Sequence, residues 1–527
     1  MSSSSSSPKV GGFTDSHELP EKEVASTEKA IDQSLQDPDR AYTFLTQQPA
    51  PGEDGPAIDL PALRRKVDWR IVPIMFLCYT MQFIDKVSLN YAAVMGLTKD
   101  LNLKGNDFTN AATSFFIAYL IAEVPNGYIL NKLPPAKWLA ANVTLWGIAT
   151  ACTAAAHNYR ALLAARIFLG IFEAAIAPSL MLISSQWYTK SEQAPRFSFW
   201  YCGLGIGQII GGIVSYAFQQ VKVESFEGWR IMFVVLGVVT VIIGGITALF
   251  LPDTPMSARF LTNAEKAAIL RHISSNQTGV QNTHFKFAHV IEVLLDPQIY
   301  LMTLLTILIS VSSGVVTSYS ATLIRNVGYK SDQAALLNMP SGIVSIFSTI
   351  LVGVGVRYVP GGHRWAWIVL CCVPGILGGG LMSFLPSSAT NHNKAGLLAG
   401  VYLVNFIVAT LIVIYQWTAS NTAGHTKRVV SVALISGSFS VGNIIGPQTF
   451  QAKDAPQYIP AKITVLATQA AGALVAILLF LYYRWANAKK DARSAAHRRN
   501  NDAVLSQDKS QWDNLTDREN PDFRYVY

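Results

Sequence analysis

Arg166-Ile-Phe-Leu-Gly-Ile-Phe-Glu-Ala-Ala-Ile-Ala-Pro-Ser179 places two charges inside an almost wholly apolar run, which extends from about Tyr159 to Met181. Because Arg166 and Glu173 are seven residues apart, they share one face of a helix and lie about 10 Å apart along its axis. A charge at the centre of a membrane helix costs roughly 3 kcal/mol on insertion scales. Such charges normally face a protein interior or a water-filled cavity. The stretch therefore predicts a helix that lines a transport pathway.

The composition of the whole chain agrees with a membrane protein. Half of its 527 residues are hydrophobic and 14% are charged, whereas soluble proteins carry about 25% charged residues. The basic residues behind the net charge of +8 flank apolar runs, as they do in cytoplasmic membrane loops. Nucleic-acid binding is therefore not expected. The five cysteines fall inside apolar runs without metal-type spacing, which indicates packing residues.

Twelve apolar runs of about 20 residues, the length that spans a bilayer, follow the polar N-terminal segment. They form two groups of six, separated by a polar segment in which Thr262-Asn-Ala-Glu265 predicts the capping box of a short helix. The runs cover approximately residues 71–96, 108–130, 137–156, 159–186, 196–218, 229–251, 299–324, 334–357, 364–386, 395–418, 428–450 and 461–484.

The two groups of runs repeat each other. Gly207-Gln-Ile-Ile-Gly211 matches Gly442-Asn-Ile-Ile-Gly446, and each motif lies in the fifth run of its group. A parallel repeat of two six-helix halves predicts a central cavity at their interface. We therefore expect an all-α membrane protein with twelve transmembrane helices in two pseudo-symmetric bundles. Its expected parts are a disordered cytoplasmic N-terminal tail (1–66), an N-terminal bundle (67–251), a cytoplasmic linker with a short helix (252–296), a C-terminal bundle (297–485) and a cytoplasmic C-terminal tail (486–527).

The distribution of basic residues predicts the orientation. Lys and Arg are concentrated in both tails and in the loops on the same side as the tails, whereas the opposite loops are more acidic. Both termini are therefore expected in the cytoplasm. We expect a monomeric multi-pass protein in a lipid bilayer, most simply the plasma membrane.

Polar side chains in the first run form a candidate binding stripe. Tyr79, Gln82, Lys86 and Asn90 lie on one helical stripe, and we expect Gln82, Lys86 and Asn90 to line the cavity. Asp85 lies about 100° around the helix from Lys86. Two hypotheses stay open for Asp85: it takes part in proton coupling, or it forms a structural link to Lys86 or to a neighbouring helix.

Three further ionisable groups lie inside apolar runs. Glu123 precedes Pro125 by two residues and is either a protonatable coupling group or part of a gate; we favour the gate. Arg166 keeps its charge and needs an anion, which could be Glu173, Asp85 or a substrate carboxylate. Glu173 can take up a proton. A fixed cation beside a titratable acid is what a proton-coupled anion carrier requires, although a permanent structural ion pair is the alternative.

The second half offers uncharged polar groups. They are candidates for hydrogen bonds to the body of a substrate or, individually, for helix–helix contacts. These are Tyr319, Asn405, Gln416 and Asn443. The sequence contains no P-loop, no G-x-S-x-G motif, no metal-ligand spacing and no dinucleotide-binding fingerprint. An enzyme, a cofactor and a bound metal are therefore not expected, and uphill transport would have to use an ion gradient.

Four motifs resemble a known family over about residues 67–484. They are Phe83-Ile-Asp-Lys-Val-Ser-Leu-Asn-Tyr-Ala-Ala, Ala118-Tyr-Leu-Ile-Ala-Glu-Val-Pro, Arg166-Ile-Phe-Leu-Gly-Ile-Phe-Glu-Ala and Asn421-Thr-Ala-Gly-His-Thr-Lys-Arg428. The chain resembles carriers of the major facilitator superfamily, in the anion:cation symporter branch and close to the fungal allantoate permeases. The resemblance implies contacts from Lys86 and Arg166 to a substrate carboxylate, proton transfer at Glu173 and a substrate-region role for Tyr319.

The resulting functional hypothesis is proton-coupled uptake of a small organic anion, such as allantoate, a ureido acid or another small carboxylate, by alternating access. Two alternatives stay open. The chain could export a secondary metabolite, or it could be a nutrient sensor that binds the same ligand without transporting it.

Overall fold

The computed structural model describes residues 59–221, 227–274, 287–359, 361–385, 391–423, 425–500, 516–520 and 523–527. These residues form helices and contain no strand. Most of the predicted N-terminal tail, up to residue 58, lies outside the described residues, and helix α3 already begins at Leu60.

Helices from the first half of the chain form one bundle. Its elements are α3 (Leu60–Met95), α4 (Leu97–Asp100), α5 (Asp107–Lys132), α6 (Pro135–Thr153), α7 (Tyr159–Glu173), α8 (Ile176–Trp187), α9 (Lys190–Tyr201), α10 (Gly203–Gln220) and α11 (Gly228–Phe250). The linker contains the 3₁₀ turn η1 (Pro255–Ser257) and the helices α12 (Asn263–Ser274) and α13 (Phe287–Leu294). The predicted capping box is present, since the backbone N–H of Thr262 donates to Glu265 at 2.8 Å.

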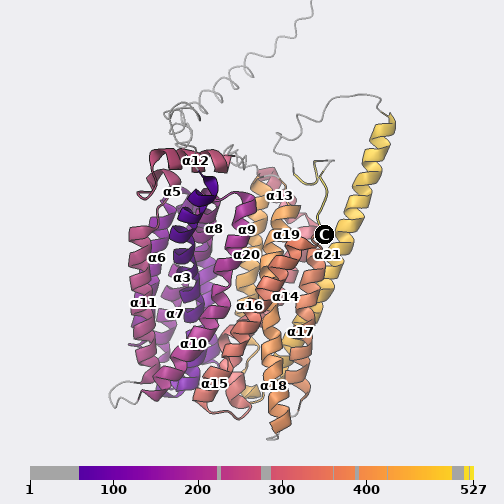
Figure 1. Ribbon diagram of the computed structural model, residues 1–527. Helices are drawn as coiled ribbons and strands as arrows, with labels where there is room; N and C mark the ends of the chain where they lie inside the picture. Colours follow the sequence, from indigo (N-terminus) through magenta and orange to yellow (C-terminus); the bar gives the residue numbers. More distant parts are fainter. Residues whose placement is uncertain are drawn as a thin grey trace, which may run out of the picture.

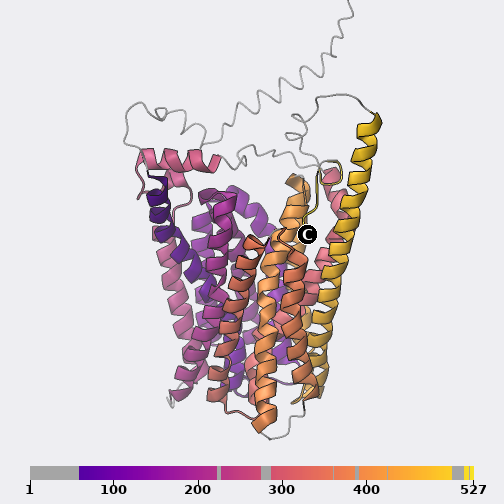
Figure 2. The same cartoon turned by 45° about the vertical axis from the view of Figure 1, so that its right-hand side comes forward.

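Helices from the second half form the other bundle, which lies beside the first (Figures 1 and 2). Its elements are α14 (Pro297–Asn326), α15 (Ser331–Leu337), α16 (Met339–Tyr358), α17 (Arg364–Phe384), α18 (Asn391–Val404), η2 (Asn405–Ile407), α19 (Val408–Asn421), α20 (His425–Gln448), η3 (Ala452–Asp454) and α21 (Ile459–Asn500). Helix α21 continues through Ala486 into the range that we assigned to the C-terminal tail.

The predicted apolar runs correspond to these helices. Among the described residues, ten helical segments are long and apolar enough to cross a membrane. Helices α5 and α6 are not among them, but they pack against α7 and α11 within the first bundle. Helix α5 is more polar because it carries charged and amide side chains, among them Asp107, Glu123 and Asn126. We use "linker side" for the end of the molecule that carries α12 and α13 (Figure 1).

The repeated glycine motif lies at a close contact between the first and fifth spans in both bundles. A Cβ on Gly207 would lie 2.9 Å from the carbonyl oxygen of Thr80, so α10 approaches α3 closely. A Cβ on Gly442 would lie 2.4 Å from Cβ of Ser310, so α20 approaches α14 in the same way. Both sites exclude a larger side chain.

The fourth span of each half is interrupted. Helix α7 ends at Glu173 and α8 begins at Ile176; Pro178 lacks the N–H that a continuous helix would use at this position. In the second half, the 3₁₀ turn η2 interrupts the span between α18 and α19. Interrupted helices at corresponding positions of two repeats are a common mark of a transporter's binding site.

Polar contacts join the two bundles on the side opposite the linker. Thr109, near the start of α5, bonds to Tyr319 of α14 at 2.6 Å. The amide of Gln448, at the end of α20, donates to Thr113 at 2.9 Å. In the same region, Asn338 donates to Tyr91 at 3.1 Å. These contacts close the bundle interface on that side.

The packing of the glycine motif yields a test of the fold. Replacing Gly207 or Gly442 by leucine should lower thermal stability in detergent, because overpacking of a close helix contact costs about 1–3 kcal/mol or more. The control is Gly245→Leu in α11, where a Cβ meets no atom within 4 Å. The measurement is the melting temperature of the purified protein. Equal melting of Gly207→Leu and Gly245→Leu would contradict the packing account.

Candidate functional site

A cavity of about 320 Å³ lies between the two bundles, and both halves contribute to its wall. From the first half, its lining includes residues of α3, α5, α8, α9 and α10; from the second, residues of α14, η2, α19 and α20. Both interrupted spans reach it, through Pro178 on α8 and through Ile407 and Val408 beside η2. On α20 the lining extends from Val429 to Asn443, so the cavity runs toward the linker side.

An ion pair at the cavity wall joins two of the predicted residues. Nζ of Lys86 lies 3.1 Å from Oε1 of Glu173. The Lys86 side chain is 15% exposed and lines the cavity, whereas the Glu173 side chain is fully buried behind it. The same ammonium group lies 5.5 Å from the centre of the Tyr119 ring. The site therefore presents a cation to the cavity and keeps its counter-ion out of reach.

Arg166 lies on the same helix as Glu173, but the carboxylate of Glu173 pairs with Lys86. The Arg166 guanidinium lies 4.8 Å from the centre of the Phe115 ring, and its buried Nε has no hydrogen-bond partner in the described part of the chain. Arg166 does not belong to the cavity lining. The structure thus separates the two predicted cations, with Lys86 at the wall and Arg166 behind it.

Asp85 is held by a neighbouring helix. Its Oδ2 accepts hydrogen bonds from Nε1 of Trp146 at 2.6 Å and from the hydroxyl of Thr150 at 3.0 Å, both on α6. The other oxygen, Oδ1, is buried and has no hydrogen-bond partner among the described residues. This geometry matches the structural link that was one of the two hypotheses for Asp85.

The cavity wall contains three more of the predicted residues. Gln82 and Asn443 line it from α3 and α20; the Asn443 amide also donates to the carbonyl oxygen of Phe439 at 2.8 Å. Glu123 lines it from α5 and accepts a hydrogen bond from the hydroxyl of Ser436 on α20. This bond crosses from one bundle to the other, as a gate contact would.

Asn90 and Tyr319 lie outside the cavity lining, in the contacts that join the bundles. The Asn90 amide meets the hydroxyl of Ser320 at 3.0 Å. The Tyr319 ring stacks on Phe450 with centroids 4.0 Å apart, and its hydroxyl bonds to Thr109. The structure places both residues where the bundles meet on the side opposite the linker.

Asn405 and Gln416 are also absent from the cavity lining. Asn405 begins η2, and its amide donates to the carbonyl oxygen of Val401 at 2.9 Å. Its buried Oδ1 has no hydrogen-bond partner in the described ranges. On α19 it is Tyr415, the residue before Gln416, that lines the cavity.

Aromatic side chains make up much of the cavity wall, and the sequence prediction singled out few of them. They are Tyr79, Phe83, Phe116, Tyr119, Phe197, Trp200, Tyr201, Tyr415 and Phe439. Tyr79 packs edge-on against Trp200, with centroids 4.6 Å apart. A signal was available for Tyr79, because it continues the helical stripe of Gln82 and Lys86. Aromatic residues elsewhere in apolar helices give no such signal, since lipid contact or helix packing explains them equally well.

Comparison with known proteins identifies related carriers. The sequence profile described as Major Facilitator Superfamily matches residues 75–447. The chain is 38% identical over 474 residues to the thiamine pathway transporter THI73 of Saccharomyces cerevisiae, covering 89% of this chain and 86% of that protein. It is 31% identical over 478 residues to the allantoate permease of the same yeast, covering 88% and 86%.

Solved structures share the fold at low sequence identity. One is the xylose transporter XylE from E. coli in a partially occluded inward-open conformation, with a TM-score of 0.58, 16% identity and coverage of 79% of this chain and 99% of that one. Another is an inward-facing bacterial homologue of the human lysosomal transporter Spinster, with a TM-score of 0.57, 18% identity and coverage of 80% and 97%. With its two six-helix halves, its central cavity and the matching profile, the chain belongs to the major facilitator superfamily.

Proposed function

We propose that this transporter takes up a small organic anion together with a proton, and that the exchange of partners at Lys86 couples the two. The observation that carries the proposal is the ion pair between Lys86 and the fully buried Glu173 at the cavity wall. A carboxylate entering the cavity and the carboxylate of Glu173 compete for the same ammonium group. Protonation of Glu173 removes one competitor and leaves Lys86 available to the substrate.

Charge balance explains why proton and anion would travel together. Arg166, Asp85 and Glu173 are buried in the first bundle, and Lys86 lies beside Glu173 at the cavity wall, so that two cations and two acids lie close to one another. An uncompensated charge in this setting is costly. Neutralising Glu173 leaves one positive charge in excess, and a bound anion restores the balance. Release of the anion favours renewed ionisation of Glu173 and its pairing with Lys86.

The cavity wall supports a small cargo with a flat or apolar body. Its volume of about 320 Å³ lies at the lower end of small-molecule pockets. Aromatic faces surround the single cation Lys86, while Gln82 and Asn443 supply hydrogen-bonding groups. Small carboxylates and ureido acids fit this chemistry, and allantoate is a first probe because a relative bears that name.

Alternating access has a structural basis in the two kinds of bundle contact. Hydrogen bonds join the bundles on the side opposite the linker, while Glu123 and Ser436 meet across the cavity. With the linker in the cytoplasm, as the basic residues predict, this arrangement is one from which cargo would leave toward the cytoplasm. Breaking the first set of contacts would open the cavity to the other side.

Removing the Lys86 cation should abolish anion recognition. We expect Lys86→Met to lose roughly 10- to 100-fold in affinity for the transported carboxylate, because a hydrogen bond to a charged group contributes about 1.5–3 kcal/mol. The probe is labelled allantoate, followed by a panel of carboxylates and ureides, in cells without their own permeases. The matched control is Lys104→Met, which removes an exposed lysine outside the cavity. Unchanged uptake by Lys86→Met would exclude Lys86 as the anion site.

Replacing Glu173 by glutamine should separate anion exchange from proton coupling. The neutral amide imitates protonated Glu173, so Lys86 stays available to the anion at every pH. We expect Glu173→Gln to exchange internal for external anion, while a pH gradient no longer drives accumulation in proteoliposomes. Accumulation that still follows the gradient would show that another group carries the proton. Accumulation driven outward in the wild type would favour the exporter, and binding without any flux would favour the sensor.

A further inference from the structure

A fully buried lysine lies at the linker side of the second bundle. Nζ of Lys427, near the start of α20, is 2.9 Å from Glu292, 2.8 Å from Asp296 and 2.6 Å from Asp517. The three acids lie close enough together to hold a metal ion, but the ammonium group already serves as their cation. Asp517 does not belong to the bundle; it comes from the C-terminal segment, by which we mean Thr516–Asn520 and Phe523–Tyr527.

The C-terminal segment brings a cation as well as an acid to this cluster. Arg518 Nη2 lies 3.1 Å from Asp296, next to the contact of Asp517 with Lys427. The amide of Gln298 donates to both Asp296, at 2.7 Å, and Asp517, at 3.0 Å. Two neighbouring residues of the segment therefore add one acid and one cation to the charged cluster of the bundle.

Two asparagine side chains hold the backbone of the segment. The Asn421 amide donates to the carbonyl oxygen of Val526 at 2.9 Å and accepts from its N–H at 2.7 Å. Asn487 makes the same pair of bonds to Tyr525, each at 2.9 Å. Nε1 of Trp417 adds a bond to Val526 at 2.8 Å. Paired recognition of N–H and C=O is how a site binds an extended peptide in one register.

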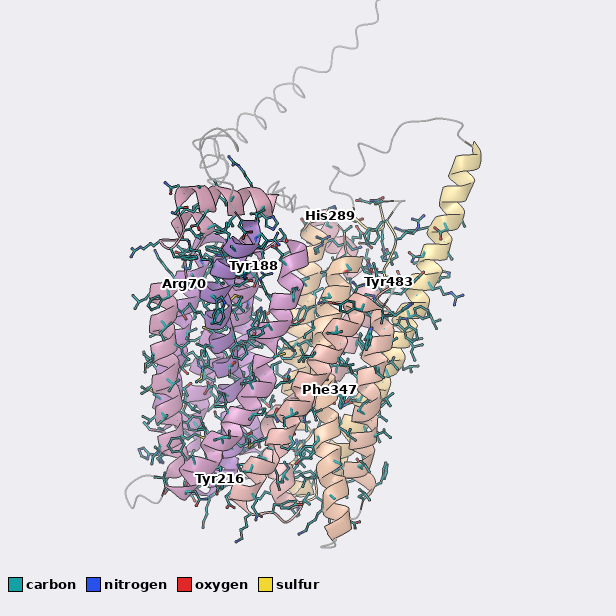
Figure 3. The ribbon with its side chains drawn as sticks, in the orientation of Figure 1. Arg70, Tyr188, Tyr216, His289, Phe347 and Tyr483 are labelled. Carbon is teal, nitrogen blue, oxygen red and sulfur yellow. The ribbon has the colours of Figure 1, made fainter. Side chains whose placement is uncertain are left out.

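Aromatic contacts complete the groove. The ring of Tyr525 stacks on Tyr483 with centroids 5.2 Å apart, and its hydroxyl donates to Asp517 at 2.7 Å. Tyr527 meets Phe480 edge-on at 5.5 Å. Figure 3 shows Tyr483 on α21 toward the linker side, and Figure 1 shows the end of the chain beside α19 and α21.

The first bundle has an ion pair of its own between the first and fifth spans. Arg196 at the start of the fifth span pairs in bidentate fashion with Asp68 of the first span, at 2.6 Å for each bond. In the second half, Lys427 near the start of the fifth span pairs with Asp296, the residue before the first span. Beside this pair, His272 of α12 contacts Glu192 at 3.0 Å. Burial acts to raise the pKa of Glu192, but hydrogen bonds from His272 and Thr189 hold it below its usual value.

We propose that the groove formed by α19, α20 and α21 is a peptide-binding site, and that the C-terminal segment is its detachable ligand. While bound, the segment fixes the linker-side end of α20. That end matters because α20 also carries Ser436 and Asn443 at the cavity wall, and Ser436 lies nine residues from Lys427, roughly 13–14 Å along the helix. Release leaves Lys427 without Asp517 and frees the end of α20 to move.

The nature of the contacts makes the segment detachable. Most of them are hydrogen bonds and ion pairs at the end of the bundle; of the segment's aromatic side chains Tyr525 is buried, while Phe523 and Tyr527 are only partly buried. Few buried apolar contacts give a segment a low local stability. The helices of the bundle, in contrast, are held together along their whole length.

Hydrogen–deuterium exchange on the full-length protein tests this proposal. In Asn421→Ala and Asp517→Asn, exchange over residues 516–527 should rise roughly tenfold or more, and the first turns of α20 should exchange faster with it. The matched control is Asp491→Asn, which removes an exposed ion pair of the same segment with Arg524 and should leave exchange unchanged. Size-exclusion profiles identify variants that fail to fold. If one of the two test variants does not fold, the other one alone is enough to test the proposal.

A synthetic peptide with the sequence of residues 516–527 provides the second arm. Added to Asp517→Asn, in which the groove itself is intact, it should restore slow exchange at the start of α20. Failure to restore it, while the variant's own segment is released, would overturn the assignment of a peptide site. Equal exchange of residues 516–527 in the wild type and in Asn421→Ala would overturn it too, because those bonds would then not hold the segment.

Discussion

The ion pair of Lys86 with Glu173 depends on a constraint that governs the whole molecule: charge inside a membrane must be compensated by charge from another helix. Lys86 comes from α3 and Glu173 from the end of α7, so the pair ties together two spans of the first bundle. Glu173 is the last residue of α7, and its buried carboxylate lies behind Lys86 at the cavity wall. In the proposed mechanism, the ion pair that holds these two spans together is also the one that the substrate anion replaces.

At the linker side, each repeat also contains an ion pair in which one span compensates the charge of another. Asp68 with Arg196, and Asp296 with Lys427, join the first span of a half to its fifth. The glycines at 207 and 442 let the same spans approach each other closely deeper in the bundle. Each half is thus fixed internally by an ion pair and a close helix contact, whereas the two halves meet through hydrogen bonds, among them those of Thr109 and Gln448 and that of Glu123 with Ser436. Such a division suits two bundles that move against each other as units.

Much of the fold followed from the sequence because the signals were long and repeated. Apolar runs, a polar linker and a glycine motif in corresponding spans suffice to predict two six-helix halves. Of the stripe predicted in the first run, Gln82 and Lys86 lie at the cavity wall. The sequence could not tell which acid pairs with which base, since Glu173 is close to Arg166 along its own helix but meets Lys86 across helices. Nor could it separate Asn90 and Tyr319, which bridge the bundles, from residues that face the cavity. Asp517 and Lys427 are 90 residues apart in the sequence, and no local sequence pattern predicts their contact.

The central claim is that the proton and the anion compete through Glu173 for Lys86, and proton uptake during anion binding tests it most directly. Purified transporter in weakly buffered solution with a pH-sensitive dye is mixed with the transported carboxylate, in the wild type and in Glu173→Gln. The account predicts that the wild type takes up a proton with each bound anion, and that the variant binds the anion without any change in pH. Proton uptake of equal size in both proteins would contradict the account.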